Sequence, residues 1–253
     1  MQEQFNALTD SQWQVIKKII DTGRKRKHSL RHILEAILWI TRTGTQWRNM
    51  ESKYPAWQIV YYYYSKWRDD QSLNKLQKAL VEMERRAKGR EKQASVAAID
   101  SQRIKAMAFT YEQKGVDANK KINGRKRHIV VDTLGLPLAI YVGAANEQDG
   151  VAGIELLWQM EKTSKRLQLI RADSAYRGDF TEASAIYGWV VEIAQKPESA
   201  KGFVPQKGRW QVERSFAWLN FFRRLSKDYE RTTASAVAFI QLAFISSILA
   251  RMP

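Results

Sequence analysis

The chain has no cysteine and only three histidines in 253 residues. Without cysteine it cannot build a disulfide scaffold, an iron–sulfur cluster or a zinc finger with thiolate ligands. The same absence fits the reducing cytoplasm of a cell. His28, His32 and His128 show no metal-ligand spacing, so a structural or phosphate-contacting role is expected for each. The composition therefore excludes thiol-based scaffolds and thiolate metal centres.

Acidic residues are also scarce relative to basic ones. The chain carries 42 Lys and Arg against 26 Asp and Glu, which gives a formal net charge of +16. Such an excess predicts a polyanionic partner, and nucleic acid is the first expectation. An anionic membrane surface is the competing interpretation, and charge alone does not separate the two. The length allows one large domain or a catalytic domain with a smaller companion.

Long apolar segments are nearly absent. Residues 1–5 lack the basic start and apolar stretch of a signal peptide. The segment 233–250 approaches the length of about 20 residues that spans a bilayer. Four polar residues interrupt this segment and a cation closes it: Ser235, Gln241, Ser246, Ser247 and Arg251. A buried C-terminal helix, and no membrane segment, is therefore expected.

Residues 1–90 are predicted to be helical throughout. The segment Thr9-Asp10-Ser11 offers an N-cap for a first helix, and Ser29 can cap a second. Apolar residues at helical spacing then predict a third helix after Pro55 and a fourth from Leu73 to Ala87. The aromatic residues of the third helix, Trp57 and Tyr61 to Tyr64, could stack on unpaired bases. At helical spacing a core role is favoured for them.

Two basic runs stand out within this charge pattern. The first is Arg24-Lys25-Arg26-Lys27, followed by Arg31, at the junction of the first two helices. A solvated surface is the ordinary meaning of such a run. In a chain this basic a DNA contact is favoured, as in helix-turn-helix modules. The run Arg125-Lys126-Arg127 receives the same interpretation.

Residues after 90 alternate between strands and helices. Strands are predicted at 95–100, 128–132, 138–142, 167–172 and 189–194. Helices are predicted at 151–162, 179–187, 209–225 and 233–250, and Trp210 and Trp218 of the third should pack against the sheet. The polar segment 101–124 is expected to be a loop. This order predicts an α/β fold with a mixed five-stranded sheet flanked by helices.

Three carboxylates have positions that suggest chemistry. Two predicted strands end on Asp100 and Asp173, and a late helix carries Glu213. Carboxylates at the ends of neighbouring strands and on a packed helix can converge at one edge of a sheet. Such oxygen ligands suit Mg²⁺ or Mn²⁺. Two such ions about 4 Å apart can activate a water or a 3′-hydroxyl for phosphoryl transfer.

Other acids near element ends receive simpler interpretations. Asp132 could be a metal ligand, but an exposed hairpin position before a Leu-Gly turn is favoured. Glu147 and Asp149 flank a helix start and are expected to be ordinary N-terminal acids, and Asp179 is expected to cap a helix.

A series of motifs extends over nearly the whole chain. In the first half they are Leu8-Thr9-Asp10-Ser11-Gln12-Trp13, Arg42-Thr43-Gly44-Thr45-Gln46-Trp47-Arg48 and Trp57-Gln58-Ile59-Val60-Tyr61-Tyr62-Tyr63. In the second half they are Ala98-Ile99-Asp100-Ser101-Gln102, Ala172-Asp173-Ser174-Ala175-Tyr176-Arg177-Gly178 and Val212-Glu213-Arg214-Ser215-Phe216. With these motifs in this order, the sequence resembles a bacterial insertion-sequence transposase of the insertion-sequence-five type, within the Asp-Asp-Glu superfamily.

The resemblance implies a fold and a division of labour. It implies a ribonuclease-H-like catalytic domain at 91–253, including the C-terminal helix, and an all-helical DNA-binding domain at 1–90. It implies Mg²⁺-dependent cleavage at transposon ends, with Mn²⁺ as a substitute, followed by joining of the 3′-hydroxyl to target DNA. Asp100, Asp173 and Glu213 would be the catalytic metal ligands.

Partners and DNA contacts follow from the same resemblance. The DNA partners would be the double-stranded terminal inverted repeats of the transposon and the target DNA. The protein partners would be further copies of this chain, in a homodimer or larger synaptic complex at the bacterial nucleoid. Around Glu213 the family signature is matched at Arg209, but Gln206 and Asn220 replace its Tyr and Lys. The expected DNA-contact residues are Arg24, Lys25, Arg26, Lys27, Arg31, Arg48, Arg125, Lys126, Arg127, Arg209, Arg223 and Arg224.

Two other hypotheses remain open. A domesticated or inactive transposase would only bind DNA, and a nuclease on the same core would cut DNA without strand transfer. Terminal inverted repeats beside the gene would favour the transposase.

Overall fold

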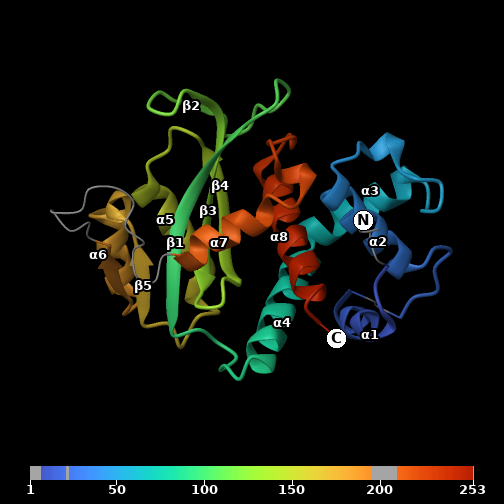
Figure 1. The fold of residues 1–253 in the computed structure, drawn as a ribbon, viewed down its shortest axis with the longest axis horizontal. Coiled ribbons are helices and arrows are strands. Elements are labelled where there is room, and N and C mark those ends of the chain that lie inside the picture. The colour runs from blue at the N-terminus through green and yellow to red at the C-terminus, as the bar shows by residue number, and fades with distance from the viewer. Residues whose placement is uncertain (1–6, 21–22, 195–209, 253) are drawn as a thin grey trace.

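A computed structural model describes residues 7–20, 23–194 and 210–252 (Figure 1). The N-terminal part is helical, as predicted. Its helices are α1 (Asp10–Ile20), α2 (Leu30–Thr43), α3 (Trp57–Asp69) and α4 (Ser72–Ala87), with a 3-10 turn at Trp47–Asn49 between α2 and α3.

The start of α1 is fixed by a reciprocal pair of hydrogen bonds. The Thr9 hydroxyl accepts from the Gln12 N–H at 3.2 Å, and the Gln12 side chain accepts from the Thr9 N–H at 2.9 Å. This capping box satisfies two backbone donors at the helix start. Ser29 precedes α2 as predicted, but its side chain makes no capping hydrogen bond. Gly44 ends α2 in the left-handed region, with φ of 72°.

The described part of the second half forms one mixed, six-stranded sheet. Its strands are β1 (Val96–Lys105), β2 (Gly115–Asp117), β3 (Ile122–Asp132), β4 (Pro137–Ala144), β5 (Leu169–Ala172) and β6 (Val190–Ile193). Their order is β2-β3-β1-β5-β6, and β4 also pairs with β3. Strands β1, β3 and β4 pair antiparallel, whereas β1, β5 and β6 pair parallel. The mixed α/β fold is confirmed, and the sheet has one strand more than predicted.

The additional strand lies in the segment predicted to be a loop. Strand β1 continues to Lys105, which pairs with Gly124, and β2 pairs with the start of β3. The side chains of this extension are polar except for Ile104 and none of them is buried, so they show no hydrophobic alternation. An ion pair between Arg103 and Asp117 helps to hold it. The sequence pattern missed these strands because the alternation it relies on reports a buried face.

Helices cover both faces of the sheet. They are α5 (Asp149–Glu161), α6 (Asp179–Ile186), α7 (Trp210–Leu219) and α8 (Thr233–Leu249). Ala98 of β1 packs in one core with α7 and α8, whereas its neighbours Ala97 and Ile99 pack in another with α5 and α6. Because successive strand side chains point to opposite faces, the sheet separates an α7–α8 face from an α5–α6 face.

The N-terminal helices join the core of the α7–α8 face. Figure 1 shows α4 and α8 between the sheet and α1 to α3. The apolar run predicted as a buried C-terminal helix is α8, and most of its residues are buried. Among the described residues, no helix has both the length and the apolar character needed to cross a membrane.

Candidate active site

Asp100 and Asp173 occupy equivalent positions on neighbouring parallel strands. Strands β1 and β5 pair in parallel with Ala98 opposite Arg171. Asp100 and Asp173 each follow that pair by two residues, so the same register brings them side by side. The predicted strand end at Asp173 agrees with β5, which stops at Ala172, whereas β1 continues past Asp100 to Lys105 and corrects the predicted end there.

The alternation of side chains also decides which face these aspartates share. Ala98 packs in the core with α7 and α8, and Asp100 lies two residues further along the same strand. Asp100 therefore lies on the α7–α8 face. Helix α7 contacts β1 and β3 on this face, and Figure 1 shows its start crossing β1. Glu213 lies in the first turn of α7 and is exposed, whereas Val212 and Phe216 face the core.

The two aspartates already accept backbone hydrogen bonds. Asp100 Oδ1 accepts from the Ser101 N–H at 2.7 Å, and Asp173 Oδ1 accepts from the Ala175 N–H at 2.9 Å. A carboxylate has about four lone-pair positions, so such bonds orient it and leave capacity for a cation. In the described ranges, no three acidic or histidine side chains form a group able to hold a metal ion. The complete centre of Asp100, Asp173 and Glu213 thus stays a prediction.

A buried polar cluster lies on the opposite face of the sheet from Asp100, and the sequence pattern did not reveal it. The Tyr176 hydroxyl lies 3.3 Å from His128 Nδ1. Asp149 Oδ1 lies 3.7 Å from the same nitrogen and 3.1 Å from Lys126 Nζ. His128 and Tyr176 are fully buried. Asp149 was predicted to be an ordinary N-terminal acid, and it does begin α5, but it also pairs with these buried groups.

Protonation in this cluster follows from burial. Burial lowers the pKa of His128 to about 3, although the Asp149 carboxylate opposes the shift. His128 is therefore neutral at pH 7, which confirms a structural role and excludes a cationic phosphate contact. Burial also raises the pKa of the Tyr176 hydroxyl, and the charges of Asp149, Asp100 and Asp173 add to that effect. Tyr176 thus stays protonated within this cluster, where its hydroxyl contacts His128 and the Ser101 side chain.

The run Arg125-Lys126-Arg127 corrects the sequence prediction of a DNA contact. These side chains are 0%, 3% and 2% exposed on the central strand β3. Arg125 Nε donates to the Glu112 carbonyl at 2.9 Å, and Arg127 Nη1 donates to the Leu225 carbonyl at 2.9 Å. Burial lowers the pKa of Arg127 to about 10. DNA has no access to side chains that the fold itself encloses.

The other predicted DNA-contact residues divide into engaged and exposed ones. Arg31 forms ion pairs with Asp10 at 2.5 Å and Glu35 at 3.3 Å, which ties α1 to α2. Arg224 pairs with the buried Glu230 at 2.7 Å. Arg26 is half-buried and donates to the Arg24 carbonyl at 2.8 Å. The exposed members are Arg24, Lys25, Lys27, Arg48 and Arg223, and Arg209 lies outside the described residues.

Asp132 is a second correction, because it is fully buried rather than exposed at the hairpin. It forms an ion pair with the buried Arg85. Its Oδ1 accepts from the N–H groups of Leu134 and Leu136, both at 2.8 Å. These bonds close the β3–β4 turn and give Asp132 a structural role inside the fold.

Aromatic residues also differ in part from their predicted roles. Tyr64 is buried as expected, but Tyr61 and Tyr62 are exposed. Trp210 is exposed and does not pack against the sheet. Instead Trp210 and Trp218 enclose Arg214, whose guanidinium lies 4.4 Å and 4.9 Å from their ring centroids. The eight-residue spacing does put both rings on one side of α7, but there they pack against the Arg214 guanidinium.

Comparison with known proteins agrees with this arrangement. Residues 91–249 match the family described as Transposase DDE domain. Residues 8–95 match a family of provisionally assigned transposases of the IS4/5 family. A protein of Burkholderia cepacia, provisionally named as a transposase for insertion sequence element IS402, is 30% identical over 126 residues. That alignment covers 47% of this chain and 60% of the relative.

Proposed function

Because the chain belongs to the Transposase DDE domain family, we propose that it cleaves the ends of its own insertion sequence and joins the freed 3′-hydroxyl to target DNA. The observation that carries this proposal is the pairing of β1 with β5, which sets Asp100 beside Asp173 on the face that α7 covers. Glu213 on α7 would complete the catalytic group.

The three carboxylates have the donor chemistry of a Mg²⁺ site, with Mn²⁺ as a substitute. Two such ions bound there would supply Lewis-acid activation of the attacking oxygen and charge stabilisation of the leaving oxygen. The protein's own contribution is orientation. The backbone N–H groups of Ser101 and Ala175 fix one oxygen of each aspartate, and the Tyr176 N–H donates to the Asp173 carbonyl at 3.2 Å.

DNA binding would come from exposed cations rather than from those buried in β3. We propose that residues 1–90 bind the terminal repeat, with Arg24, Lys25, Lys27 and Arg48 on phosphates, and that residues 91–253 hold the catalytic centre. Arg223, after α7, is the exposed cation on the catalytic side. The net charge of +16 supports a polyanionic partner of this kind.

Two DNA ends must be handled together for strand transfer, so we propose a homodimer or larger synaptic complex. The reaction takes place on the nucleoid, in the cytoplasm. A nuclease would share the cleavage step, and it differs from a transposase only in lacking the joining step.

The proposal is tested with linear DNA that carries the element's own end, a supercoiled target plasmid and Mg²⁺ or Mn²⁺. We expect nicking at the end and joined products, both abolished in Asp100→Asn and Asp173→Asn. Asp179→Asn, an exposed aspartate six residues after Asp173, is the matched control and should retain both. Nicking without joined products would identify a nuclease, and tight binding without nicking would identify a DNA-binding protein.

A further inference from the structure

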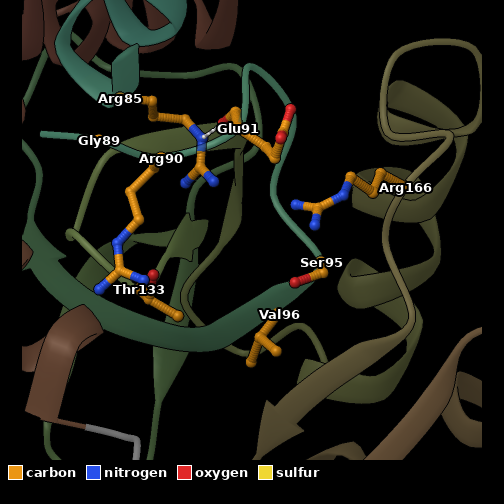
Figure 2. A pocket seen from close by; sticks show the side chains of 8 residues that line it. All are labelled: Arg85, Gly89, Arg90, Glu91, Ser95, Val96, Thr133 and Arg166. Carbon is orange, nitrogen blue, oxygen red and sulfur yellow. Dashed lines mark hydrogen bonds between the residues drawn. The ribbon is translucent and has the colours of Figure 1, made fainter. Parts of the chain in front are cut away.

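A second polar cavity lies at the beginning of β1, away from the paired aspartates. Its volume is about 360 Å³. The connection from α4 to β1, the β3–β4 turn and the loop before β5 form its walls, as Figure 2 shows. Asp100 follows Ser95, in this cavity, by five residue steps along the chain. At a rise of about 3.3 Å per residue the separation is roughly 17 Å.

Three guanidinium groups meet at this cavity. Arg85 is held in place because it pairs with Asp132 and its Nε donates to the Glu91 carbonyl at 2.8 Å. Arg166 Nη1 donates to the Gln93 carbonyl at 3.3 Å. Figure 2 shows the Arg166 guanidinium and the Ser95 hydroxyl directed into the cavity, and the Arg90 guanidinium beside Thr133. Hydrogen-bond donors from three segments thus converge on one space.

The charge at this cavity is not balanced. The buried Asp132 compensates Arg85. Within the described part of the chain, Arg90 and Arg166 have no ion pair with any acid. The carboxylate of Glu91 lies on the rim, on the side away from the Arg90 guanidinium (Figure 2). Two uncompensated guanidiniums with nearby hydroxyl groups suit an anion that offers several acceptor oxygens.

We propose that this cavity, the β1-start pocket, binds a backbone phosphate of the DNA that the protein acts on. The proposal rests on the proposed function for its choice of DNA as the source of the phosphate. The net charge of +16 and the exposed Lys88 beside the pocket favour a long polyanion over a small phosphate compound. The phosphate is not the one that is cleaved, because about 17 Å corresponds to roughly five base pairs of duplex at 3.4 Å each.

The test compares two variants that remove equal charge from the same two segments. Arg90→Gln/Arg166→Gln removes the two uncompensated guanidiniums of the pocket. Arg86→Gln/Lys165→Gln is the matched control, because both residues are exposed and neither lines the pocket. Affinity for a duplex carrying the element's end is measured by fluorescence anisotropy at several salt concentrations.

We expect the pocket variant to bind about tenfold more weakly than the control variant, because an Arg–phosphate hydrogen bond is charge-assisted and geometrically fixed. The slope of log affinity against log salt should fall by about 0.9, the value for one phosphate contact. Glu91→Gln should strengthen binding, because it removes the carboxylate from the rim. Equal affinities for the pocket and control variants would overturn the proposal.

A scan of methylphosphonate substitutions identifies the phosphate itself. Neutralising one phosphate other than the one that is cleaved should weaken DNA binding by wild type. The same substitution should leave DNA binding by the pocket variant unchanged. A thermal-shift assay with inorganic phosphate tests whether the pocket binds a small phosphate ligand instead. The DNA assignment would be overturned if phosphate stabilised wild type but not the pocket variant while both proteins bound DNA with the same affinity. Failure of the proposed function looks different, since wild type would then bind duplex through the pocket without cleaving it.

Discussion

Asp100 and Asp173 lie side by side because the parallel strands β1 and β5 carry them at equivalent positions. Asp100 lies within β1, and Asp173 directly follows β5 as the N-cap of the 3-10 turn Ser174–Tyr176. Each carboxylate also accepts a hydrogen bond from a nearby backbone N–H. Preorganisation of this kind lets a site act on a phosphodiester without rearranging first.

Tyr176→Phe tests whether the buried tyrosine positions these carboxylates. The substitution removes a hydroxyl that lies 3.3 Å from His128 and hydrogen-bonds the side chain of Ser101, the residue after Asp100. We expect a fold of unchanged stability within about 1 kcal/mol. The Mg²⁺ concentration for half-maximal cleavage should rise about 10- to 100-fold, the usual effect of removing a partner of a metal ligand.

The matched control is Tyr187→Phe. Tyr187 packs at the edge of the α5–α6 core, where its ring stacks on that of Trp189 with the centroids 5.1 Å apart. A Mg²⁺ titration of cleavage separates the two variants, because only the Tyr176 hydroxyl hydrogen-bonds the residue next to Asp100. Identical titration curves for Tyr176→Phe and wild type would exclude a positioning role.

His128 makes stability depend on pH. Its pKa is about 3 in the folded chain, below the ordinary value of 6.5. Between these values the unfolded chain binds a proton that the folded chain does not, so stability falls as pH falls from about 6.5. The slope from this group approaches about 1.4 kcal/mol per pH unit. Urea unfolding at pH 7, 6, 5 and 4 should show a flatter profile for His128→Gln, and parallel profiles would refute the assignment.

Asp132→Asn tests the structural role assigned to that residue. The change leaves Arg85 buried without its counter-charge, which should lower the free energy of unfolding by about 3 to 5 kcal/mol in urea. Cleavage by the folded fraction should keep its Mg²⁺ dependence, because Asp132 binds Arg85 and two backbone N–H groups. Glu182→Gln, an exposed change, should cost less than about 0.5 kcal/mol. A shifted Mg²⁺ dependence in Asp132→Asn would instead restore the metal-ligand hypothesis.

Exposed and buried cations should differ in their effect on DNA binding. Arg24→Gln/Lys25→Gln/Lys27→Gln should reduce the salt slope by about 0.9 for each phosphate that the variant no longer neutralises. Arg125→Met should instead destabilise the fold, because Arg125 joins β3 to the carbonyls of Glu112 and Glu230. Anisotropy titrations of folded Arg125→Met should show the same slope of log affinity against log salt as wild type. A reduced slope for Arg125→Met would mean that DNA does reach this side chain.

The sequence allowed the fold to be predicted where burial imposes a pattern. The residues of β1 before Asp100 are apolar, so this part of the strand was visible, and β5 stops at Ala172, directly before Asp173, as expected. The expectation that the first strand ends on Asp100 was wrong, because β1 continues to Lys105. The extension of β1 to Lys105 was not visible, because its side chains are polar and no core imposes alternation on them.

Side-chain roles were harder to predict where compensation comes from distant residues. Arg125 looked like a surface cation because its partners, Asp228 and the carbonyl of Glu230, follow it by more than 100 residues. The link between Tyr176 and His128 depends in the same way on two segments that only the folded sheet brings together. A single sequence contains no signal for such pairings. The spacing of Lys126 and His128 shows only that both residues lie on the same face of a strand.

The most direct test of the central claim is single-turnover cleavage of the element's end with Mg²⁺ by wild type, Glu213→Gln and Glu182→Gln. Both substitutions replace an exposed glutamate, on α7 and α6 respectively, so their effects on charge and stability are matched. Loss of cleavage in Glu213→Gln alone, with DNA affinity retained, is the predicted result. Equal cleavage by the two variants would contradict the assignment of Glu213 to the catalytic group.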